Sequence, residues 1–128
     1  NGRQGIVNTY ASTIIPFRYN KIQQEGNIYY VTANGKKGIF NRYGSTIIPC
    51  QYDEIISLGH RYIVKRDKKF GVYNQYGSTI LPCQFQKIEC LNNGHYVTTR
   101  DKSQQVYNAY GALLENRTNM NVVFSTED

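Results

Sequence analysis

The sequence contains no tryptophan and one methionine, and no hydrophobic run approaches the roughly 20 residues of a membrane-spanning helix. The N-terminus lacks the charged and then apolar layout of a signal peptide. Cysteine is also scarce. Three cysteines are an odd number, so at least one has no partner within the chain, which argues against a disulfide scaffold and slightly favours the cytoplasm. Helical periodicity does not extend beyond a few residues, which argues against a helical fold.

The residues that are abundant favour strands and turns. Twelve tyrosines and eleven glycines among 128 residues, with many Val, Ile and Thr, are typical of β structure. We expect residues 1–128 to form a single domain of ordinary size. The net charge is +6, and the residues from 115 onwards carry −2, so the preceding body carries +8. This charge permits an anionic partner.

An internal repeat of 33 residues dominates the sequence. Residues 38–55 read GIFNRYGSTIIPCQYDEI, and the same phrase recurs at 5–22 and at 71–88. A fourth copy begins one residue late at Val106 and fades after Leu114. We therefore expect three full repeats and a partial fourth, followed by a cap or tail. Their boundaries are 2–34, 35–67, 68–101 and 102–114, with the cap or tail over 115–128.

Each repeat divides into short strands separated by turn signals. In the second repeat, Asn41 can open a turn by bonding to its own backbone, and Gly44 supplies the positive φ that closes the turn. Ala11 replaces this glycine in the first repeat, so that turn must differ or be strained. Further strands before and after Pro49 complete the unit. The sequence predicts an all-β fold of three-stranded antiparallel units.

The repeats are expected to stack as an open, elongated array, because each unit buries its apolar face against its neighbours. A propeller-like ring is the alternative. About three and a half units are few for a closed ring, which typically has four to eight blades.

The units resemble WG repeats, also called KWG repeats. The resemblance is carried by residues 35–41 (GKKGIFN) and 47–55 (IIPCQYDEI), and it covers about residues 2–114. The tryptophan of the WG dipeptide is replaced by Gln4, Lys37 and Phe70. The resemblance implies a β-repeat module, mostly bacterial, that serves in binding or scaffolding and has no catalytic residues.

Basic residues recur at the turns between repeats. They are Lys36, Lys37, Lys65, Arg66, Lys68, Lys69, Arg100 and Lys102. Such a stripe can follow an anionic polymer or an acidic protein. Lysines at strand edges also prevent edge-to-edge pairing, and Asp67 and Asp101 dilute the stripe.

Aromatic residues form three columns at the repeat spacing. The first, expected in the core, is Tyr19, Tyr52 and Phe85; the second, expected to be exposed at turns, is Tyr10, Tyr43, Tyr76 and Tyr110; the third is Tyr30, Tyr62 and Tyr96. Exposed rings can stack on sugars or bases. Tyr43 and Tyr76 therefore join the basic residues as a possible partner surface.

The remaining polar candidates favour structural roles. Cys50 and Cys83 replace Phe17 in register, so we expect both thiols to be buried as small apolar groups. No Cys or His spacing suits a metal site, and we expect no cofactor. Asp53 and Glu54 are the clearest exception to the repeat. Adjacent strand residues point to opposite faces, so these two carboxylates cannot form a facing acid–base pair.

These observations predict a non-catalytic binding or scaffolding module whose partner is a protein. The alternative is recognition of an anionic or carbohydrate polymer through the basic turns and the exposed tyrosines. No enzyme activity is expected, because no phosphate-binding loop or nucleophile motif occurs in the sequence.

Overall fold

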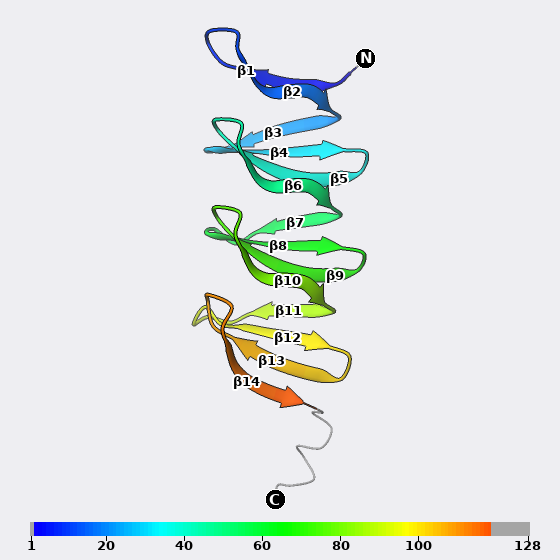
Figure 1. The fold of residues 1–128 in the computed structure, drawn as a ribbon, viewed down its shortest axis with the longest axis vertical. Helices are drawn as coiled ribbons and strands as arrows, with labels where there is room; N and C mark the ends of the chain where they lie inside the picture. The colour runs from blue at the N-terminus through cyan, green and yellow to red at the C-terminus, as the bar shows by residue number, and fades with distance from the viewer. Residues whose placement is uncertain (1, 119–128) are drawn as a thin grey trace, which may run out of the picture.

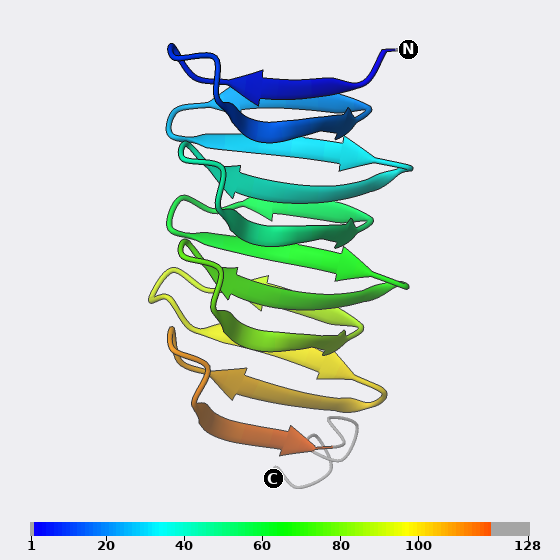
Figure 2. The ribbon, with the colours of Figure 1, turned by 45° about the horizontal axis from the view of Figure 1, so that its top comes forward.

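The computed structural model describes residues 2–118, which form fourteen strands in four antiparallel sheets without a helix. The sheets follow one another along a single axis, with the first and last at opposite ends (Figures 1 and 2). Within the described residues no strand pairing joins these two end sheets. The predicted open, all-β stack is confirmed, and the propeller alternative is not what this chain forms.

Each sheet is a meander in which a strand pairs with the next strand along the chain. The first sheet contains β1 (Gln4–Val7) and β2 (Thr13–Tyr19). The second contains β3 (Lys21–Glu25), β4 (Ile28–Ala33), β5 (Lys36–Asn41) and β6 (Thr46–Tyr52). The third contains β7 (Glu54–Ser57), β8 (Arg61–Arg66), β9 (Lys69–Asn74) and β10 (Thr79–Phe85). The fourth contains β11 (Lys87–Cys90), β12 (Tyr96–Arg100), β13 (Ser103–Tyr107) and β14 (Leu113–Thr118).

The complete sheets have four strands rather than the three expected from the sequence. The additional strand is short, but β7 pairs with β8 at every residue from Glu54 to Ser57. Each complete sheet begins directly after a corner residue, at which the chain passes from one sheet to the next. The corner residues are Asn20, Asp53 and Gln86, near the end of the repeated phrase. The incomplete unit is therefore the first sheet. At the other end, β14 includes residues 115–118, and the rest of the predicted cap or tail lies outside the described residues.

The one-residue delay of the fourth copy arises in a single hairpin loop. Between β7 and β8, the amide of Leu58 donates to the carbonyl of Arg61 at 2.8 Å. Between β11 and β12, the amide of Leu91 donates to the carbonyl of His95, also at 2.8 Å. The second loop is one residue longer, so the insertion leaves the strands on either side in register.

Glycine allows two strands of each sheet to approach closely. A Cβ on Gly38 of β5 would lie 2.7 Å from the Cα of Cys50 in β6, and Gly71 meets Cys83 in the same way. The expectation that both thiols are buried is wrong: each is half-buried, and Phe17 at the same site is 59% exposed. Each thiol donates instead to a backbone carbonyl, that of Lys36 at 3.1 Å or of Lys69 at 2.9 Å.

The core consists of three apolar clusters. The predicted core column is confirmed, since Tyr19, Tyr52 and Phe85 are 7%, 2% and 1% exposed. Each ring makes an edge-to-face contact with a ring of the following sheet. These pairs are Tyr19 with Phe40, Tyr52 with Tyr73, and Phe85 with Tyr107, with centroids 5.7, 5.8 and 5.9 Å apart. Aromatic contacts therefore join every sheet to the next.

The third aromatic column contains Tyr29 rather than Tyr30. Tyr29 is buried and pairs with Phe40 across the sheet, as Tyr62 pairs with Tyr73 and Tyr96 with Tyr107. Tyr30 is the next residue of the same strand, so it points to the opposite face and is half-buried.

Candidate functional site

The turns of each sheet lie at two opposite ends of the strands. In an antiparallel meander, successive turns alternate between the ends. The β4–β5, β8–β9 and β12–β13 turns therefore share one end, on the right of Figure 1. The β1–β2, β5–β6, β9–β10 and β13–β14 turns share the other, on the left.

The left-hand turns share one geometry. The side-chain oxygen of Asn41 accepts hydrogen bonds from the amides of Tyr43 and Ser45 at 2.8 and 3.0 Å, as the sequence predicted. The amide of Gly44 donates to the carbonyl of Asn41 at 3.0 Å. The same side-chain bonds recur at Asn8, Asn74 and Asn108.

The glycine of each such turn also contacts the preceding sheet. A Cβ on Gly44, Gly77 or Gly111 would overlap the carbonyl oxygen of Ile14, Ile47 or Ile80, respectively. Each turn therefore lies directly against a strand of the sheet before it. This contact aligns the turns along the stack.

The aligned turns present the second aromatic column to solvent. Tyr10, Tyr43, Tyr76 and Tyr110 are 87%, 70%, 78% and 87% exposed, so their predicted exposure is confirmed. We name this row of turns, residues 8–12, 41–45, 74–78 and 108–112, the tyrosine edge.

The tyrosine edge carries arginine and a hollow beside its rings. The guanidinium of Arg42 lies 4.8 Å from the centroid of the Tyr43 ring and donates to its hydroxyl at 2.6 Å. A hollow of about 270 Å³ lies between Tyr76 and Tyr110 and includes Arg61 and Ile80 in its lining. Arg61 is held in place because it donates to the hydroxyl of Tyr96 at 2.8 Å.

The opposite end of the strands is strongly cationic, and we name it the basic edge. Apart from Arg117 of β14, which forms an ion pair with Glu115, twelve of the fifteen Lys and Arg residues lie there. They are Arg3, Arg18, Lys21, Lys36, Lys37, Lys65, Arg66, Lys68, Lys69, Lys87, Arg100 and Lys102. Four acidic residues accompany them, namely Asp53, Glu54, Asp67 and Asp101. The difference, twelve minus four, leaves this edge with a net charge of +8.

Asp53 has a structural role at a corner between sheets. One carboxylate oxygen accepts from the amide of Asp67 at 3.1 Å, and the other accepts from the ammonium of Lys36. The hydrogen bond from Lys36 is the main reason that the pKa of Asp53 lies below its ordinary value. Asn20 and Gln86, the corresponding corners, accept from the amides of Asn34 and Asp101. Asp53 is therefore one version of a repeated cap, and its neighbour Glu54 starts β7.

The predicted partner surface divides between the two edges. The structure brings its eight basic residues together on the basic edge, but it places Tyr43 and Tyr76 on the tyrosine edge. Two of the cations cover aromatic rings: the Lys65 ammonium lies 5.4 Å from the Phe70 centroid, and the Arg66 guanidinium 5.4 Å from that of Tyr52.

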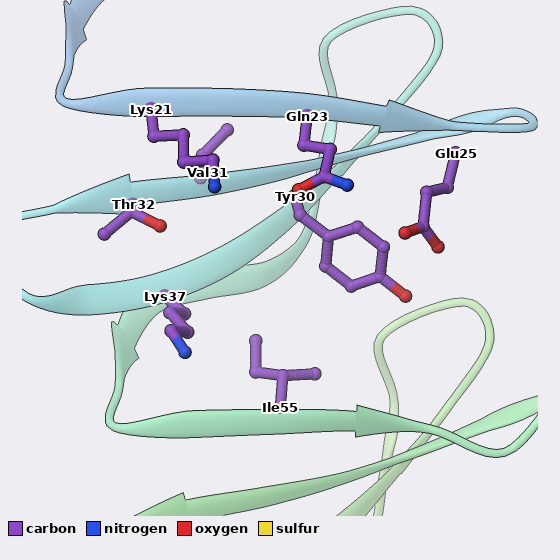
Figure 3. Close-up of a pocket in the computed structure, with 8 residues that line it drawn as sticks. All are labelled: Lys21, Gln23, Glu25, Tyr30, Val31, Thr32, Lys37 and Ile55. Atoms are coloured by element: carbon purple, nitrogen blue, oxygen red, sulfur yellow. The ribbon is translucent and has the colours of Figure 1, made fainter.

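A groove that the sequence did not predict separates the second and third sheets. It encloses about 360 Å³ and is lined by residues of β3, β4, β5 and β7 (Figure 3). Lys37, one of the residues in place of the WG tryptophan, lines it. The replacement of the tryptophan by Lys37 was the only sign of this groove in the sequence. Whether such a replacement leaves a groove depends on the side chains that the adjacent sheets contribute at the same position.

Among residues 2–118 there is no cluster of three or more His, Cys, Asp or Glu that could hold a metal ion. This part of the chain also contains no helix capable of spanning a membrane. His60 and His95 lie at turns, where the ring of His60 bonds to Gln75 at 3.2 Å and the amide of His95 to Asn93 at 3.0 Å.

Comparison with known proteins identifies the repeat. Residues 38–69 and 70–100 match the family model described as "WG containing repeat", as two consecutive copies. No curated protein matches the chain. The two matched segments begin 32 residues apart and run from β5 to β12, so they include the whole third sheet and about half of the second and of the fourth. WG repeats are repeat modules and generally non-catalytic. The chain therefore belongs to the WG-repeat family.

Proposed function

We propose that this chain is a non-catalytic module that recognises a protein partner through the tyrosine edge. The observation that carries the proposal is the row of four exposed tyrosines on turns of identical geometry. Tyrosine and arginine are enriched in the energetically important parts of protein interfaces. Tyrosine contributes a large contact area and loses little side-chain entropy on binding.

The rigidity of the turns supports the same proposal. The Asn side chain fixes each turn before any partner arrives, and the turns of Tyr43, Tyr76 and Tyr110 are also held by contact with the preceding sheet. A pre-organised surface loses less conformational entropy on association than a mobile one. The hollow between Tyr76 and Tyr110 can receive a side chain of the partner as an anchor.

A variant of the tyrosine edge tests this proposal. The double substitution Tyr43→Ser and Tyr76→Ser removes two exposed rings and leaves the turn hydrogen bonds of Asn41 and Asn74 in place. We expect the variant to fold as the parent does and to lose at least about tenfold in affinity for the partner. Capture from lysates of the source cells, quantified by mass spectrometry, measures the loss. The matched control is Lys68→Ser with Lys102→Ser, which alters the basic edge and should retain the same proteins. Equal capture by the tyrosine variant and the parent would overturn the proposal.

A second candidate is recognition of an anionic polymer, favoured by the concentration of twelve basic side chains on one edge. Binding of a DNA duplex or of heparin would then fall steeply between about 50 and 200 mM salt, because counterions are released on binding. The control variant above would lose this affinity, whereas the tyrosine variant would keep it. Salt-independent binding would exclude this candidate.

A further inference from the structure

The position of the missing tryptophan can be compared in three consecutive units. Gln4, Lys37 and Phe70 occupy it, on β1, β5 and β9. In each unit this strand contacts the first strand of the following sheet: β1 contacts β3, β5 contacts β7, and β9 contacts β11. The side chain at this position therefore decides how the space between two sheets is filled.

Two of the three units fill that space with their own side chain. Gln4 extends to the next sheet, where its side-chain oxygen accepts from the amide of Ile22 at 2.7 Å. Phe70 is half-buried and packs, together with Ile88 of the next sheet, against the third core cluster. Lys37 is exposed instead, and the groove of about 360 Å³ lies beside it.

The groove has an apolar interior and a cationic entrance. Tyr30 of β4 and Ile55 of β7 provide the apolar surface, whereas Val31, which also lines the groove, has a fully buried side chain. Lys21 and Lys37 both line the groove; the Lys37 side chain is directed from β5 towards β7, and that of Lys21 runs from β3 across to β4 (Figure 3). Neither lysine takes part in an ion pair within residues 2–118. Glu25 is the one carboxylate in the lining, so the groove is net positive.

We propose that this groove binds an acidic segment of a partner protein that inserts one aromatic side chain between the sheets. The inference rests on the proposed protein-binding function and adds a second contact surface with a defined partner chemistry. The neighbouring unit indicates the fit, because there the ring of Phe70 occupies the equivalent position with the ammonium of Lys65 5.4 Å from its centroid. A partner's ring in the groove can meet Lys37 in the same way.

The charge of the groove selects the rest of the partner segment. Acidic residues on either side of the inserted ring can pair with Lys21 and Lys37, which have no competing carboxylate partner in ion-pair contact. A polyphosphate backbone satisfies the lysines but offers no apolar group to cover Tyr30 and Ile55. The combination of both surfaces therefore favours an acidic peptide with an aromatic residue over a nucleic acid.

Binding of a labelled peptide, Asp-Glu-Asp-Trp-Asp-Glu, tests the proposal directly. Lys37→Phe places in the groove the residue that the third unit already has, so the variant should melt at or above the temperature of the parent. We expect it to bind the peptide at least about tenfold more weakly. A peptide with Ala in place of Trp should show a similar loss against the parent chain. The methyl NMR signals of Ile55 should shift on titration of the parent.

The control variant Lys102→Ala removes one charge from the basic edge far along the stack and should leave the affinity within about threefold. Equal losses for Lys102→Ala and Lys37→Phe would mean binding to the whole edge and would overturn the proposal. So would unchanged binding by Lys37→Phe, or failure of the parent to bind at millimolar peptide. None of these outcomes depends on the capture experiment at the tyrosine edge, so the two proposals fail separately.

Discussion

At the residue scale, one glycine position satisfies two requirements. Gly44, Gly77 and Gly111 adopt φ values of 87°, 91° and 90°, and each lies against the carbonyl of the preceding sheet. Ala11 occupies the equivalent site with φ 65°. It belongs to the first sheet of the described residues, where no preceding described sheet meets its Cβ. Glycine is therefore replaced by alanine at the one of these four turns where the positive φ is required but no preceding described sheet lies against the turn.

Substitution in both directions tests this explanation. We expect Gly77→Ala to lower the free energy of unfolding by more than about 2 kcal/mol, because the left-handed conformation alone costs about 1–2 kcal/mol and the Cβ must also displace the strand of Ile47. Ala11→Gly relieves the dihedral cost but gains entropy in the unfolded state, so it should change stability by less than about 1 kcal/mol. Urea melts measure both. Similar changes for the two variants would show that the contact with the preceding sheet has no role.

Several residue assignments could be made from the sequence, and others could not. The Asn and Gly turn signals and the core column of Tyr52 were predictable because local conformation and register determine them. Tyr29, 33 residues before Tyr62, is the ring in register, but the one-residue insertion before Tyr96 makes the intervals in this column uneven and obscures which ring of the doublet faces the core. The burial of Cys50 was mispredicted because Phe17, taken as its apolar equivalent, is itself exposed.

At the element scale, each four-stranded sheet is joined to the next by a capped corner and an aromatic pair. Tyr52 of the second sheet bonds through its hydroxyl to that of Tyr73 in the third sheet. Burial raises the pKa of Tyr52, and the hydrogen bond with Tyr73 raises it further. Burial also raises the pKa of Tyr62 and of Tyr96. The sheets therefore require these phenols to remain neutral.

This requirement predicts a loss of stability at alkaline pH. A group whose pKa is higher in the folded state contributes its full stability below its unfolded pKa, and that contribution is lost as pH rises through the folded value. The unfolded pKa of tyrosine is about 10, so the free energy of unfolding should fall above about pH 10. Thermal melts between pH 8 and 11 measure the decline. Tyr52→Phe should make the decline shallower, and an unchanged slope in this variant would contradict the role of Tyr52.

The separation of the two edges follows from strand topology. The sequence shows basic turns and tyrosine turns at the same period, but their placement depends on the number of strands between them. Since one strand, such as β5, separates a basic turn from a tyrosine turn, the two lie at opposite ends. The sequence does not show that a fourth, short strand pairs at the start of each complete sheet, because the residues of this strand carry no strong strand signal.

At the scale of the whole molecule, the chain is an open series of sheets with one cationic edge. Stacking was predictable from the repeat, because units of this size bury their apolar faces against neighbours. The groove beside Lys37 was not predictable, because it forms where the second unit lacks the ring that Phe70 provides in the third. The repeat therefore predicts the fold, but it does not predict the groove at the interface between the second and third sheets.

In an open stack of this kind, each sheet is stabilised by its contacts with the neighbouring sheets. Ile15 and Ile48 occupy equivalent positions in the first and second sheets, and both are fully buried. Replacing either by Ala removes the same atoms, a change that typically costs about 2–5 kcal/mol. Ile15 lies in the two-stranded sheet at one end, whereas Ile48 lies in a complete sheet with a neighbour on each side.

Native-state hydrogen exchange of the two variants, resolved by strand, is the most direct test. Ile15→Ala should increase exchange in β1 and β2 and leave the protection of β8 and β9 as in the parent. Ile48→Ala should increase exchange in the second and third sheets together, because Ile48 packs in the core cluster that joins these two sheets. Equal loss of protection in every sheet, whichever isoleucine is replaced, would contradict the open stack.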